Sequence, residues 1–484
     1  MNPILPLNEY IPDGEPHVFG DRVYLYGSHD KARSDRFCVQ DYTVWSAHVD
    51  DLSKWTNHGV TYKKIQDPRS KPGREVDFYA PDCVRGNDGR YYLYYCAMGP
   101  NTKNFGPMSV AVSDEPCGPF EYLGDIRYAD GTPVLKYLTN DPAVINDNGR
   151  IWLYYGWGLA RDFSSKLMSP IYNIVQSRLF ARPVAEIKAT APSILSCAVV
   201  ELSDDMLTVK SEPKAVLDSK TTAPKNSELY NHAFYEAPSI RKIGDTYYLI
   251  YSSGENNELA YATSKYPDRD FEYRGVIISN SDLGYKGNKK PKAPAGTIHG
   301  GIECINGKWY VFYHRCTNNT DFSRQACAEP IEILPDGSIP QVEITTQGVG
   351  KPIKAVGKIK AAICCNIIPS KPIRLGLGKQ QKESRVDDDD KDVFVADISN
   401  NTIIGYKYLD FQNIKRIALT CRGEAASVQV FADEQKCGEI ITNRCDTWEK
   451  FGGEIKIPEG THALFLHFYG KGKRDFLEIE FNEE

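Results

Sequence analysis

Several marks of specialised protein classes are absent from this 484-residue sequence. No apolar run approaches the roughly 20 residues that a membrane-spanning helix requires. Met1–Glu9 combines no basic region with an apolar stretch of the kind found in secretory signal peptides. The formal net charge is only −6 with 25% charged residues, a balance that favours neither nucleic acid nor an anionic membrane. We therefore expect no membrane segment and no nucleic-acid partner.

The cysteines also show no spacing that would indicate disulfide bonds or a metal site. The chain has 13 cysteines, an odd number, and none of them stands in C-x-x-C spacing. Cys364 and Cys365 are adjacent, which excludes a metal site built on their spacing. In a reducing compartment such thiols act as small apolar residues. The sequence therefore predicts a cytoplasmic protein without disulfide bonds.

What the chain does contain is a repeat. Six-residue blocks that read as strands of aromatic and β-branched residues begin at Arg22, Arg90, Arg150, Thr246 and Lys308. Turn sequences rich in Asn, Asp and Gly stand directly before several of these blocks. A unit of short strands that recurs every several tens of residues is typical of a β-propeller. The sequence therefore predicts an all-β fold that begins with a five-bladed β-propeller over residues 1–345.

One ionisable residue stands eight to ten positions before each block. The five are Asp13, Asp82, Asp141, Glu236 and His299. Because the innermost strand of each blade lines the axial channel, we expect these side chains to gather at one end of it. Their spacing predicts a shared polar pocket on the propeller axis.

Carboxylates in such a pocket suit the hydrolysis of a glycosidic bond, which needs one acid that stays protonated and one that is ionised. A third acid nearby would raise the pKa of the proton donor. Asp13, Asp141 and Glu236 fit these three roles by spacing, although Asp82 could replace any of them. Trp45 and Trp157 are candidate platforms on which a sugar ring could stack.

Two departures from the repeat define the remaining organisation. Residues 158–195 form an insertion, which we expect at the rim, where insertions shape pockets. Residues 346–355 read as a linker, and residues 356–484 show short alternating strands without the propeller repeat. The sequence predicts a C-terminal β-sandwich for this last segment.

The motifs of the first 340 residues resemble those of glycoside hydrolase family 43, five-bladed propeller enzymes that act on arabinose- and xylose-containing polysaccharides. The resemblance rests on Pro12-Asp13, Ala80-Pro81-Asp82, Asn140–Val144, Tyr235–Pro238 and His299-Gly300-Gly301 with Trp309–Arg315. It implies an inverting mechanism in which Asp13 is the general base, Asp141 tunes the acid and Glu236 is the general acid. Glu15 is a rival for the role of base, because it stands where the family often has Asp-Pro.

The same resemblance implies further residues of the site. His299 would face a metal ion, Ca²⁺ or another, or a water cluster on the axis, and no cofactor would be required for bond cleavage. Arg324 would contact substrate, and Tyr79 stands where the family often has a sugar-stacking Trp. The tail resembles carbohydrate-binding modules of family 6, but Lys360-Ala361-Ala362 replaces the usual calcium-binding Glu-Ala-Glu.

These inferences favour an exo-acting α-L-arabinofuranosidase that trims arabinose-containing hemicellulose oligosaccharides. The alternative within the same fold is a β-xylosidase, whose substrate would be a xylose-containing oligosaccharide. A different class, a non-catalytic sugar-binding propeller, would require the loss of one of the three acids, and all three are present.

Overall fold

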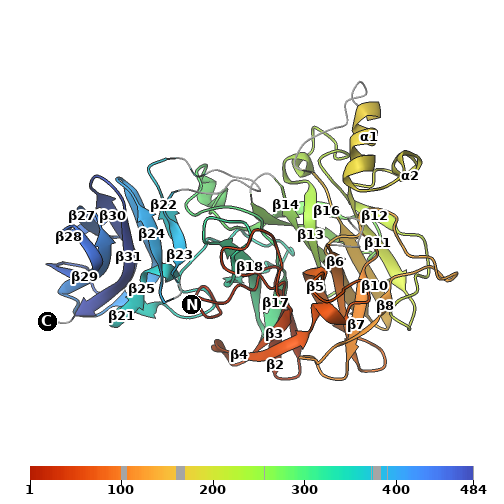
Figure 1. Cartoon of the computed structure of the whole chain (residues 1–484), viewed down its shortest axis with the longest axis horizontal. Coiled ribbons are helices and arrows are strands. Elements are labelled where there is room, and N and C mark those ends of the chain that lie inside the picture. Colours follow the sequence, from red (N-terminus) through yellow and green to blue (C-terminus); the bar gives the residue numbers. More distant parts are fainter. Residues whose placement is uncertain are drawn as a thin grey trace.

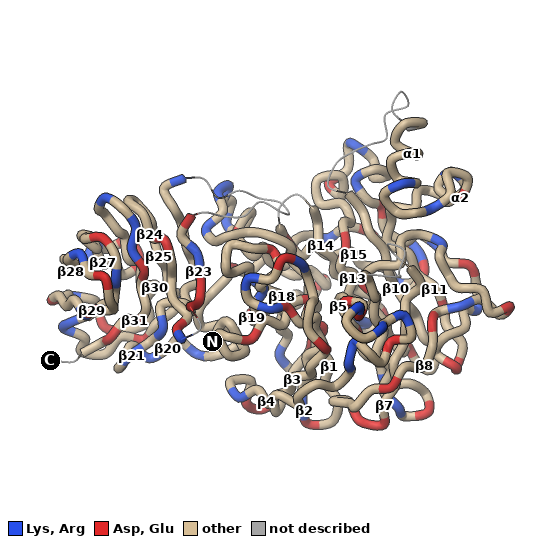
Figure 2. Tube along the Cα trace, viewed as in Figure 1, with Lys and Arg blue, Asp and Glu red and all other residues tan. Residues whose placement is uncertain are grey.

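The computed structural model describes residues 1–99, 106–159, 169–254, 257–371, 373, 383–389 and 391–482. The chain forms two β-rich lobes, with the N-terminus close to the boundary between them and the C-terminus at the far end of the smaller lobe (Figure 1). Acidic and basic residues are interspersed over both lobes (Figure 2). Among the described residues, no helix has the length and apolar character to cross a bilayer.

The larger lobe is the predicted five-bladed propeller, built from separate antiparallel sheets. The strands of blades 1 and 2 are β1 Glu15–Phe19, β2 Arg22–Tyr26, β3 Tyr42–His48, β4 Asp51–Tyr62, β5 Asp77–Arg85, β6 Tyr91–Met98, β7 Ser109–Ser113 and β8 Glu121–Asp125. Those of blades 3 to 5 are β9 Ala143–Asp147, β10 Arg150–Gly156, β11 Ser196–Leu202, β12 Lys214–Asp218, β13 Phe234–Ile243, β14 Thr246–Ser253, β15 Glu258–Ser264, β16 Glu272–Ser279, β17 Ile302–Ile305, β18 Lys308–Cys316 and β19 Arg324–Ile331. The five repeated blocks become the second strands β2, β6, β10, β14 and β18.

The blades are held together by packing of their faces. Second and third strands are buried along nearly their whole length, for example Tyr92–Ala97 in β6 and Leu259–Ala262 in β15. Continuous burial explains why these strands read as apolar runs instead of alternating patterns, because both faces of each blade contact a neighbour. Tyr62, Phe78 and Tyr95, for instance, form one aromatic cluster between blades 1 and 2, with ring centroids 4.8–5.5 Å apart.

The fifth blade has three strands of its own, and the start of the chain binds to its outer strand β19. The Ile4 amide donates to the Ala326 carbonyl at 2.9 Å. The Asn2 side chain accepts from the Ala328 amide at 2.9 Å and donates to Glu329 at 2.8 Å. These bonds join the two ends of the propeller, as a closed ring requires.

The smaller lobe is the predicted sandwich. One sheet contains β20 Ile353–Lys354, β22 Asn366–Ile368, β25 Thr402–Phe411, β27 Ala426–Ala432, β28 Gln435–Thr442 and β30 Gly460–Tyr469. The other contains β21 Gly357–Lys360, β23 Arg385–Asp388, β24 Val393–Ile398, β26 Arg416–Gly423, β29 Cys445–Glu454 and β31 Arg474–Asn482. Apolar side chains from both sheets share one core, which makes this lobe a sandwich with its own interior.

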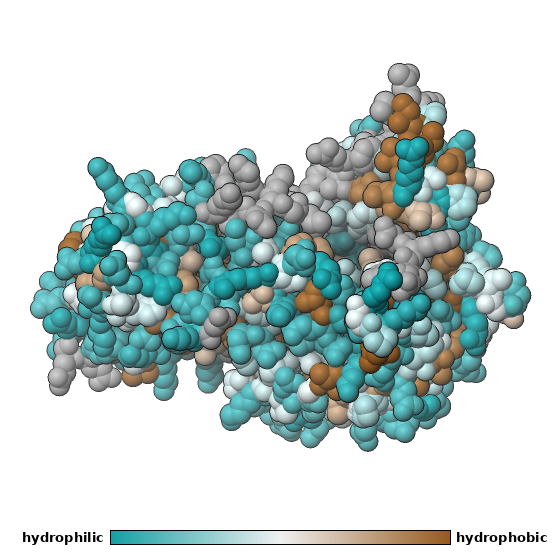
Figure 3. Space-filling view, in the orientation of Figure 1, coloured by the Kyte–Doolittle hydropathy of each residue, from teal (hydrophilic) through white to brown (hydrophobic). Residues whose placement is uncertain are grey.

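Helices are few. The segment of the predicted insertion that the structure describes contains α1 Ser169–Leu179 and α2 Val184–Ala189, which project from the propeller at its rim (Figure 1). Short 3-10 turns lie at η1 Lys64–Gln66, η2 Glu228–His232, η3 Tyr285–Gly287 and η4 Ala361–Ile363. Four apolar side chains of α1 are 49–56% exposed, namely Ile171, Ile174, Val175 and Leu179, and they form a hydrophobic spot in Figure 3.

A buried lysine joins the two lobes. Lys407, on β25, is 4% exposed and places its ammonium 3.0 Å from Asp282 and 2.9 Å from Glu343, both on the propeller side. Asp282 is itself only 1% exposed. Arg315 adds bonds from β18 to the carbonyls of Cys364 and Ala362. The lobes are therefore connected by desolvated polar groups that depend on one another.

We expect Lys407→Met to destabilise the protein by about 3 to 5 kcal/mol, because it leaves the Asp282 carboxylate buried without its cation. Thermal unfolding should show the loss as a lower Tm. The double variant Lys407→Met with Asp282→Asn should recover much of that loss, since the only carboxylate of the group left without its cation is Glu343, whose side chain is 19% exposed. A double variant as unstable as the single one would show that packing, and not charge, holds this boundary.

Candidate active site

A cavity opens on the propeller axis at the end where the strands β1, β9 and β13 begin. It encloses about 800 Å³ of free space, counting the solvent at its mouth. Its walls come from all five blades: Asp13, Phe37, Tyr79, Ala80, Met98, Asn140, Asp141, Trp157, Tyr235, Glu236, Thr297, His299 and Arg324. Four of the five ionisable residues predicted to meet at the channel mouth therefore do so.

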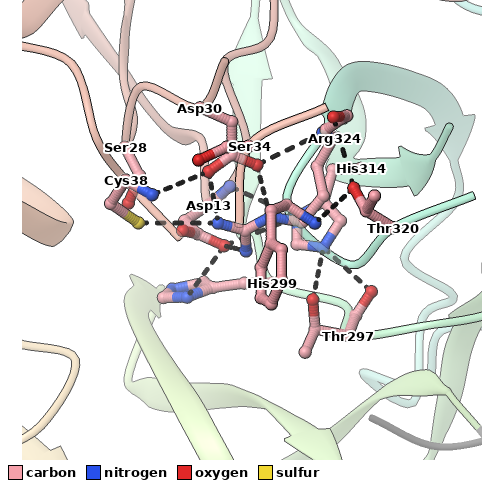
Figure 4. A network of polar contacts seen from close by, with 12 residues as sticks. Asp13, Ser28, Asp30, Ser34, Cys38, Thr297, His299, His314, Thr320 and Arg324 are labelled. Atoms are coloured by element: carbon pink, nitrogen blue, oxygen red, sulfur yellow. Dashed lines mark hydrogen bonds and ion pairs between the residues drawn. The ribbon is translucent and has the colours of Figure 1, made fainter. Parts of the chain in front are cut away.

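The first carboxylate of the site, Asp13, is held by a buried arginine (Figure 4). The Arg324 Nη1 donates to Asp13 at 2.7 Å, and the other side of the same guanidinium forks onto Asp30 at 2.8 and 3.1 Å. Asp30 is fully buried, and its carboxylate also accepts hydrogen bonds from the Cys38 and Arg324 amides at 3.0 and 3.2 Å, which hold it in place beneath the fork. The arrangement keeps the Asp13 carboxylate in one position at the wall of the cavity.

The surroundings of Asp13 favour its ionised form. Burial alone would raise its pKa, but its charged surroundings, with the Arg324 guanidinium first among them, outweigh burial and lower it. Burial lowers the pKa of His299 to about 4 and that of His314 to about 3, so both imidazoles are neutral at pH 7. Asp13 is thus a carboxylate ready to accept a proton.

Glu236 has the opposite environment. Its pKa is raised to about 7, chiefly by burial; a hydrogen bond from Trp157 opposes that rise and the charge of Asp13 contributes to it. Burial and the Glu236 charge also raise the pKa of Asp141, because two carboxylates in one dry pocket cannot both ionise cheaply. Asp141 accepts a 3.0 Å bond from the Ala237 amide, next to Glu236 in sequence. The Glu236–Asp141 pair therefore retains a proton near neutral pH.

The backbone at the cavity is strained. Asp13, Ala80, Asp141 and Ala237 have φ of 58°, 35°, 47° and 61°. Aspartate tolerates this left-handed region, but alanine does so only at a cost of order 1 kcal/mol or more. Bulges in β5 and β13 accompany these residues. Such strain at four points of one cavity is typical of a functional site, where the backbone aims side chains that a regular strand would not.

Trp157 lies at the side of Glu236. Its indole Nε1 donates to Glu236 Oε2 at 2.9 Å, and its ring contacts Phe180 and Tyr235 at centroid distances of 5.5 and 6.0 Å. Phe180 belongs to a small apolar cluster with Ile187 of α2. The insertion therefore packs against Trp157, whose indole donates the hydrogen bond that orients the Glu236 carboxyl.

Replacing Trp157 by Phe should shift the pH dependence of activity to higher pH. The indole donor stabilises the ionised form of Glu236, so its loss raises the pKa of that carboxyl above about 7. A proton donor with a higher pKa stays protonated longer as pH rises, and the basic limb of kcat/KM against pH moves upward. Trp152→Phe is the control, since Trp152 is buried away from the cavity. An unmoved or lowered basic limb would contradict the role of Trp157.

Three sequence-based expectations need correction. Trp45 cannot be a sugar platform, because it is 5% exposed and packs in the core between blades 1 and 5. Asp82 does not reach the mouth: the bulge in β5 places Ala80 at the wall and buries Asp82 deeper on the axis, bonded to His17 at 2.6 Å and to the Val144 amide at 2.6 Å. Glu15 also lies below the cavity, paired with Arg241 at 3.1 Å.

Some lining residues were not foreseen. Phe37 stacks over the Arg324 guanidinium at 4.8 Å and touches Phe322 edge-on at 4.5 Å. It comes from a long connection between β2 and β3, where no repeat guides prediction. Tyr235 and Asn140 directly precede Glu236 and Asp141, so adjacency to a candidate acid would have found them. Tyr79 and Trp157 do line the cavity as expected.

The cavity on the propeller axis contains one ionised carboxylate and a pair of carboxyl groups that retains a proton. These are the groups that a glycosidase requires. The sequence model described as Glycosyl hydrolases family 43 matches residues 1–190 and 184–339. The chain therefore belongs to glycoside hydrolase family 43, and it is a glycosidase of the xylosidase/arabinosidase type.

The relatives agree with this assignment. A xylosidase/arabinosidase from Thermoclostridium stercorarium is 40% identical over 492 residues, which cover 98% of this chain and 96% of that protein. The crystal structure of CoXyl43, a β-xylosidase/α-arabinofuranosidase from a compost microbial metagenome in complex with xylotriose, superposes with a TM-score of 0.54 at 26% identity, covering 71% and 97% of the chains. A family 43 enzyme from Xanthomonas citri complexed with xylose has the same TM-score at 25% identity, covering 70% and 92%.

The match to the family ends at residue 339, before the sandwich begins. The likeness of this lobe to carbohydrate-binding modules of family 6 thus stays a prediction. In place of the calcium-binding motif of those modules, Lys360 and the buried Ala361 and Ala362 lead into η4. These residues carry no carboxylate that could bind calcium.

His299 lies in the cavity but does not form a cage for calcium. It offers one imidazole, with Nδ1 at 3.9 Å from Asp13 and 4.0 Å from Asp141. Calcium prefers six to eight oxygen ligands. Here Asp13 Oδ1 is taken by Arg324, and Asp141 Oδ2 accepts from the Ala237 amide. The residues around His299 therefore do not fit a calcium ion.

Proposed function

We propose that this family 43 glycosidase is an exo-acting, inverting α-L-arabinofuranosidase that releases terminal arabinose from short hemicellulose oligosaccharides. The observation that carries the proposal is the contrast between Asp13, kept ionised by Arg324, and Glu236, whose pKa is raised to about 7. One group can accept a proton from water while the other gives one to the leaving oxygen. A single displacement requires two proton transfers, and this pair of residues can perform both.

Each residue of the cavity then has a defined task. Asp13 activates the water, and Arg324, fixed by Asp30, orients Asp13 and faces the sugar. Glu236 protonates the leaving oxygen, and Asp141 keeps the pKa of Glu236 high. Tyr79 and Trp157 provide aromatic walls for the pentose ring, and His299 contributes a neutral donor or acceptor.

The closed lower end of the cavity supports the proposal of exo action. Directly below it the axis is filled by Glu15, Asp82 and Arg241, each 8% exposed or less. A polysaccharide cannot thread through such a plug, so the sugar enters by its end. The free cysteines, all 13 of which lie in the described residues, support an enzyme that works in a reducing cell interior on imported oligosaccharides.

A β-xylosidase activity is the second candidate, because relatives carry both names and because the Xanthomonas citri structure contains xylose. Kinetics on 4-nitrophenyl α-L-arabinofuranoside and β-D-xylopyranoside, measured side by side, test the choice. We expect a higher kcat/KM for the arabinofuranoside. The reverse order would make the xyloside the primary substrate, and inactivity toward both would favour the sugar-binding alternative.

The product should have the inverted anomeric configuration. A water must fit between the sugar and the base, and inverting glycosidases accordingly hold their carboxyl groups roughly 6.5–9.5 Å apart, against about 5–5.5 Å in retaining ones. Asp13 and Glu236 come from blades 1 and 4 of the ring, two blades apart, which favours the wider spacing. Proton NMR of the first-formed sugar, recorded before mutarotation, should show inversion. A retained anomer, or transfer to methanol, would make one of the two residues a nucleophile.

A further inference from the structure

Two loops of the propeller meet beside Arg324 at the wall of the catalytic cavity. The first loop, residues 27–41, connects β2 to β3 and contains Phe37; the second, residues 317–323, connects β18 to β19 and contains Phe322. Phe37 lines the cavity with its ring centroid 4.8 Å from the Arg324 guanidinium, and the Phe322 ring meets it edge-on at 4.5 Å. The position of the Phe37 ring therefore depends on both loops.

The first loop is bound by the smaller lobe. The Arg33 guanidinium lies 3.2 Å from Asp387 and 3.4 Å from Asp388, both on the sandwich strand β23. The Arg33 side chain is 49% exposed, whereas those of Asp387 and Asp388 are 12% and 19% exposed. Arg33 has a φ of 56°, in the left-handed region that long side chains rarely adopt. The loop therefore holds an unfavourable backbone conformation at the residue that reaches the sandwich.

The second loop is bound by the same strand. The Asn318 amide donates to the Val386 carbonyl at 2.7 Å, and the Asn318 side chain donates to Asp388. Asn318 is 6% exposed, so these bonds are shielded from water. The two loops are also bonded to each other, because the Arg33 amide donates to the Ser323 hydroxyl at 3.0 Å. Strand β23 thus holds both loops whose phenylalanines meet at the cavity.

The residues on either side of Phe37 are held by the propeller itself. Arg36 donates to Asp77 at 2.7 Å, and the Cys38 amide donates to Asp30 at 3.0 Å. These bonds fix the backbone at Phe37. A phenyl ring forms no such bond, so its orientation depends on the groups against which it packs. Loss of the contact with the sandwich should therefore loosen the ring without unfolding the loop.

We propose that the sandwich strand β23 takes part in substrate binding, although the cavity walls named above all come from the propeller. Its carboxylates Asp387 and Asp388 are positioning residues. They bind Arg33 and Asn318, and the loops that contain these two residues hold the Phe37 ring against the sugar in the cavity. This inference rests on the proposed catalytic use of that cavity.

The loss of this positioning should raise KM and leave kcat nearly unchanged. Arg324 keeps its bonds to Asp13 and Asp30 whether or not the Phe37 ring is held in place, so the catalytic carboxylate stays oriented. What weakens is a contact made equally with the substrate and with the transition state. Removal of such uniform binding appears in KM alone.

The test compares Arg33→Met with Arg90→Met in the full-length chain. Arg90 is a matched control, because its side chain is 44% exposed and pairs with Asp114 at 2.8 Å, outside the cavity. On the nitrophenyl glycoside that wild type hydrolyses faster, Arg33→Met should raise KM about 3- to 5-fold and change kcat by less than about 2-fold. Arg90→Met should change neither constant, and Tm should fall equally little in both variants.

A double-mutant cycle separates the positioning of Phe37 from a general structural effect. Phe37→Ala removes the ring and should raise KM about 10-fold. Because Arg33 acts through that ring, Arg33→Met should add nothing in the Phe37→Ala background, whereas independent effects would multiply. Salt gives a second readout. A half-exposed ion pair is screened, so the KM of wild type should rise with NaCl concentration and that of Arg33→Met should not.

The proposal is overturned if Arg33→Met keeps the wild-type KM, if its effect multiplies with that of Phe37→Ala, or if Arg90→Met raises KM equally. Should Arg33→Met fail to fold, as judged by circular dichroism, Asp388→Asn replaces it with the same expected rise in KM. All effects are ratios to wild type, so a preference for the xyloside would correct the proposed sugar and leave this test intact. If wild type cleaves neither glycoside, the proposed function fails, and Kd values for arabinose and xylose from calorimetry replace KM in the same comparisons.

Discussion

Asp13→Asn should lower kcat by about 10³- to 10⁴-fold while the protein stays folded. Asparagine keeps the shape and can still accept the hydrogen bond from Arg324, which remains paired with Asp30. What disappears is the carboxylate that takes the proton from the attacking water. Steady-state kinetics on the preferred nitrophenyl glycoside, together with Tm, should separate the loss of chemistry from any loss of stability.

Asp67→Asn is a suitable control for this variant. Asp67 is 1% exposed and pairs with Arg69 at 2.6 Å, outside the catalytic cavity. Its replacement should lower Tm but leave kcat near that of wild type. If Asp13→Asn kept more than a tenth of the activity, the base would have to be another group, and the rival Glu15 would need to be reconsidered despite its position below the cavity.

Glu236→Gln should produce the second large effect, and its size should depend on the leaving group. On arabino-oligosaccharides the departing sugar oxygen must be protonated, so we expect a loss of about 10²–10⁴-fold in kcat/KM. On 2,4-dinitrophenyl glycosides the leaving group departs without a proton, and the loss should be much smaller. The fall in kcat/KM as pH rises through about 7, where wild-type Glu236 ionises, should also vanish in the variant.

Glu329→Gln serves as the comparison for Glu236→Gln. Glu329 is likewise buried with a pKa raised to about 8, but it bonds Asn2 and Thr345 near the lobe boundary and does not line the cavity. Its replacement should leave the pH profile intact. Equal losses of Glu236→Gln on oligosaccharides and on activated glycosides would show that Glu236 does not donate the proton.

The sequence predicted correctly those features that depend on local repetition. Strand blocks with turn residues before them recur five times, and each became the second strand of a blade. The change of pattern after the repeats became the sandwich. Period and turn chemistry are local properties, because side-chain direction in a strand and positive φ in a turn are set within a few residues.

The site was predicted only in part, for a reason visible in blade 2. Asp82 stands eight residues before its block, close to the nine of Asp13 and Asp141, yet a bulge between Tyr79 and Asp82 moves it one level down the channel. A bulge adds a residue to one strand, so equal spacing in sequence no longer means equal depth in space. Trp45 shows the same limit: its side of β3 faces a neighbouring blade, which only the packing of the ring reveals.

By itself, then, the sequence determined the number of blades, the two-lobed organisation and the carboxylates that stand at blade entrances. Each of these features depends on residue patterns that extend over only a few positions. The tertiary structure alone decided which acids share one cavity and which carry charge there. Arg324 and Asp13 are far apart in the chain, and only closure of the propeller brings their side chains to 2.7 Å. Burial and such long-range charges set the opposite protonation of Asp13 and Glu236, and no local pattern encodes either of them.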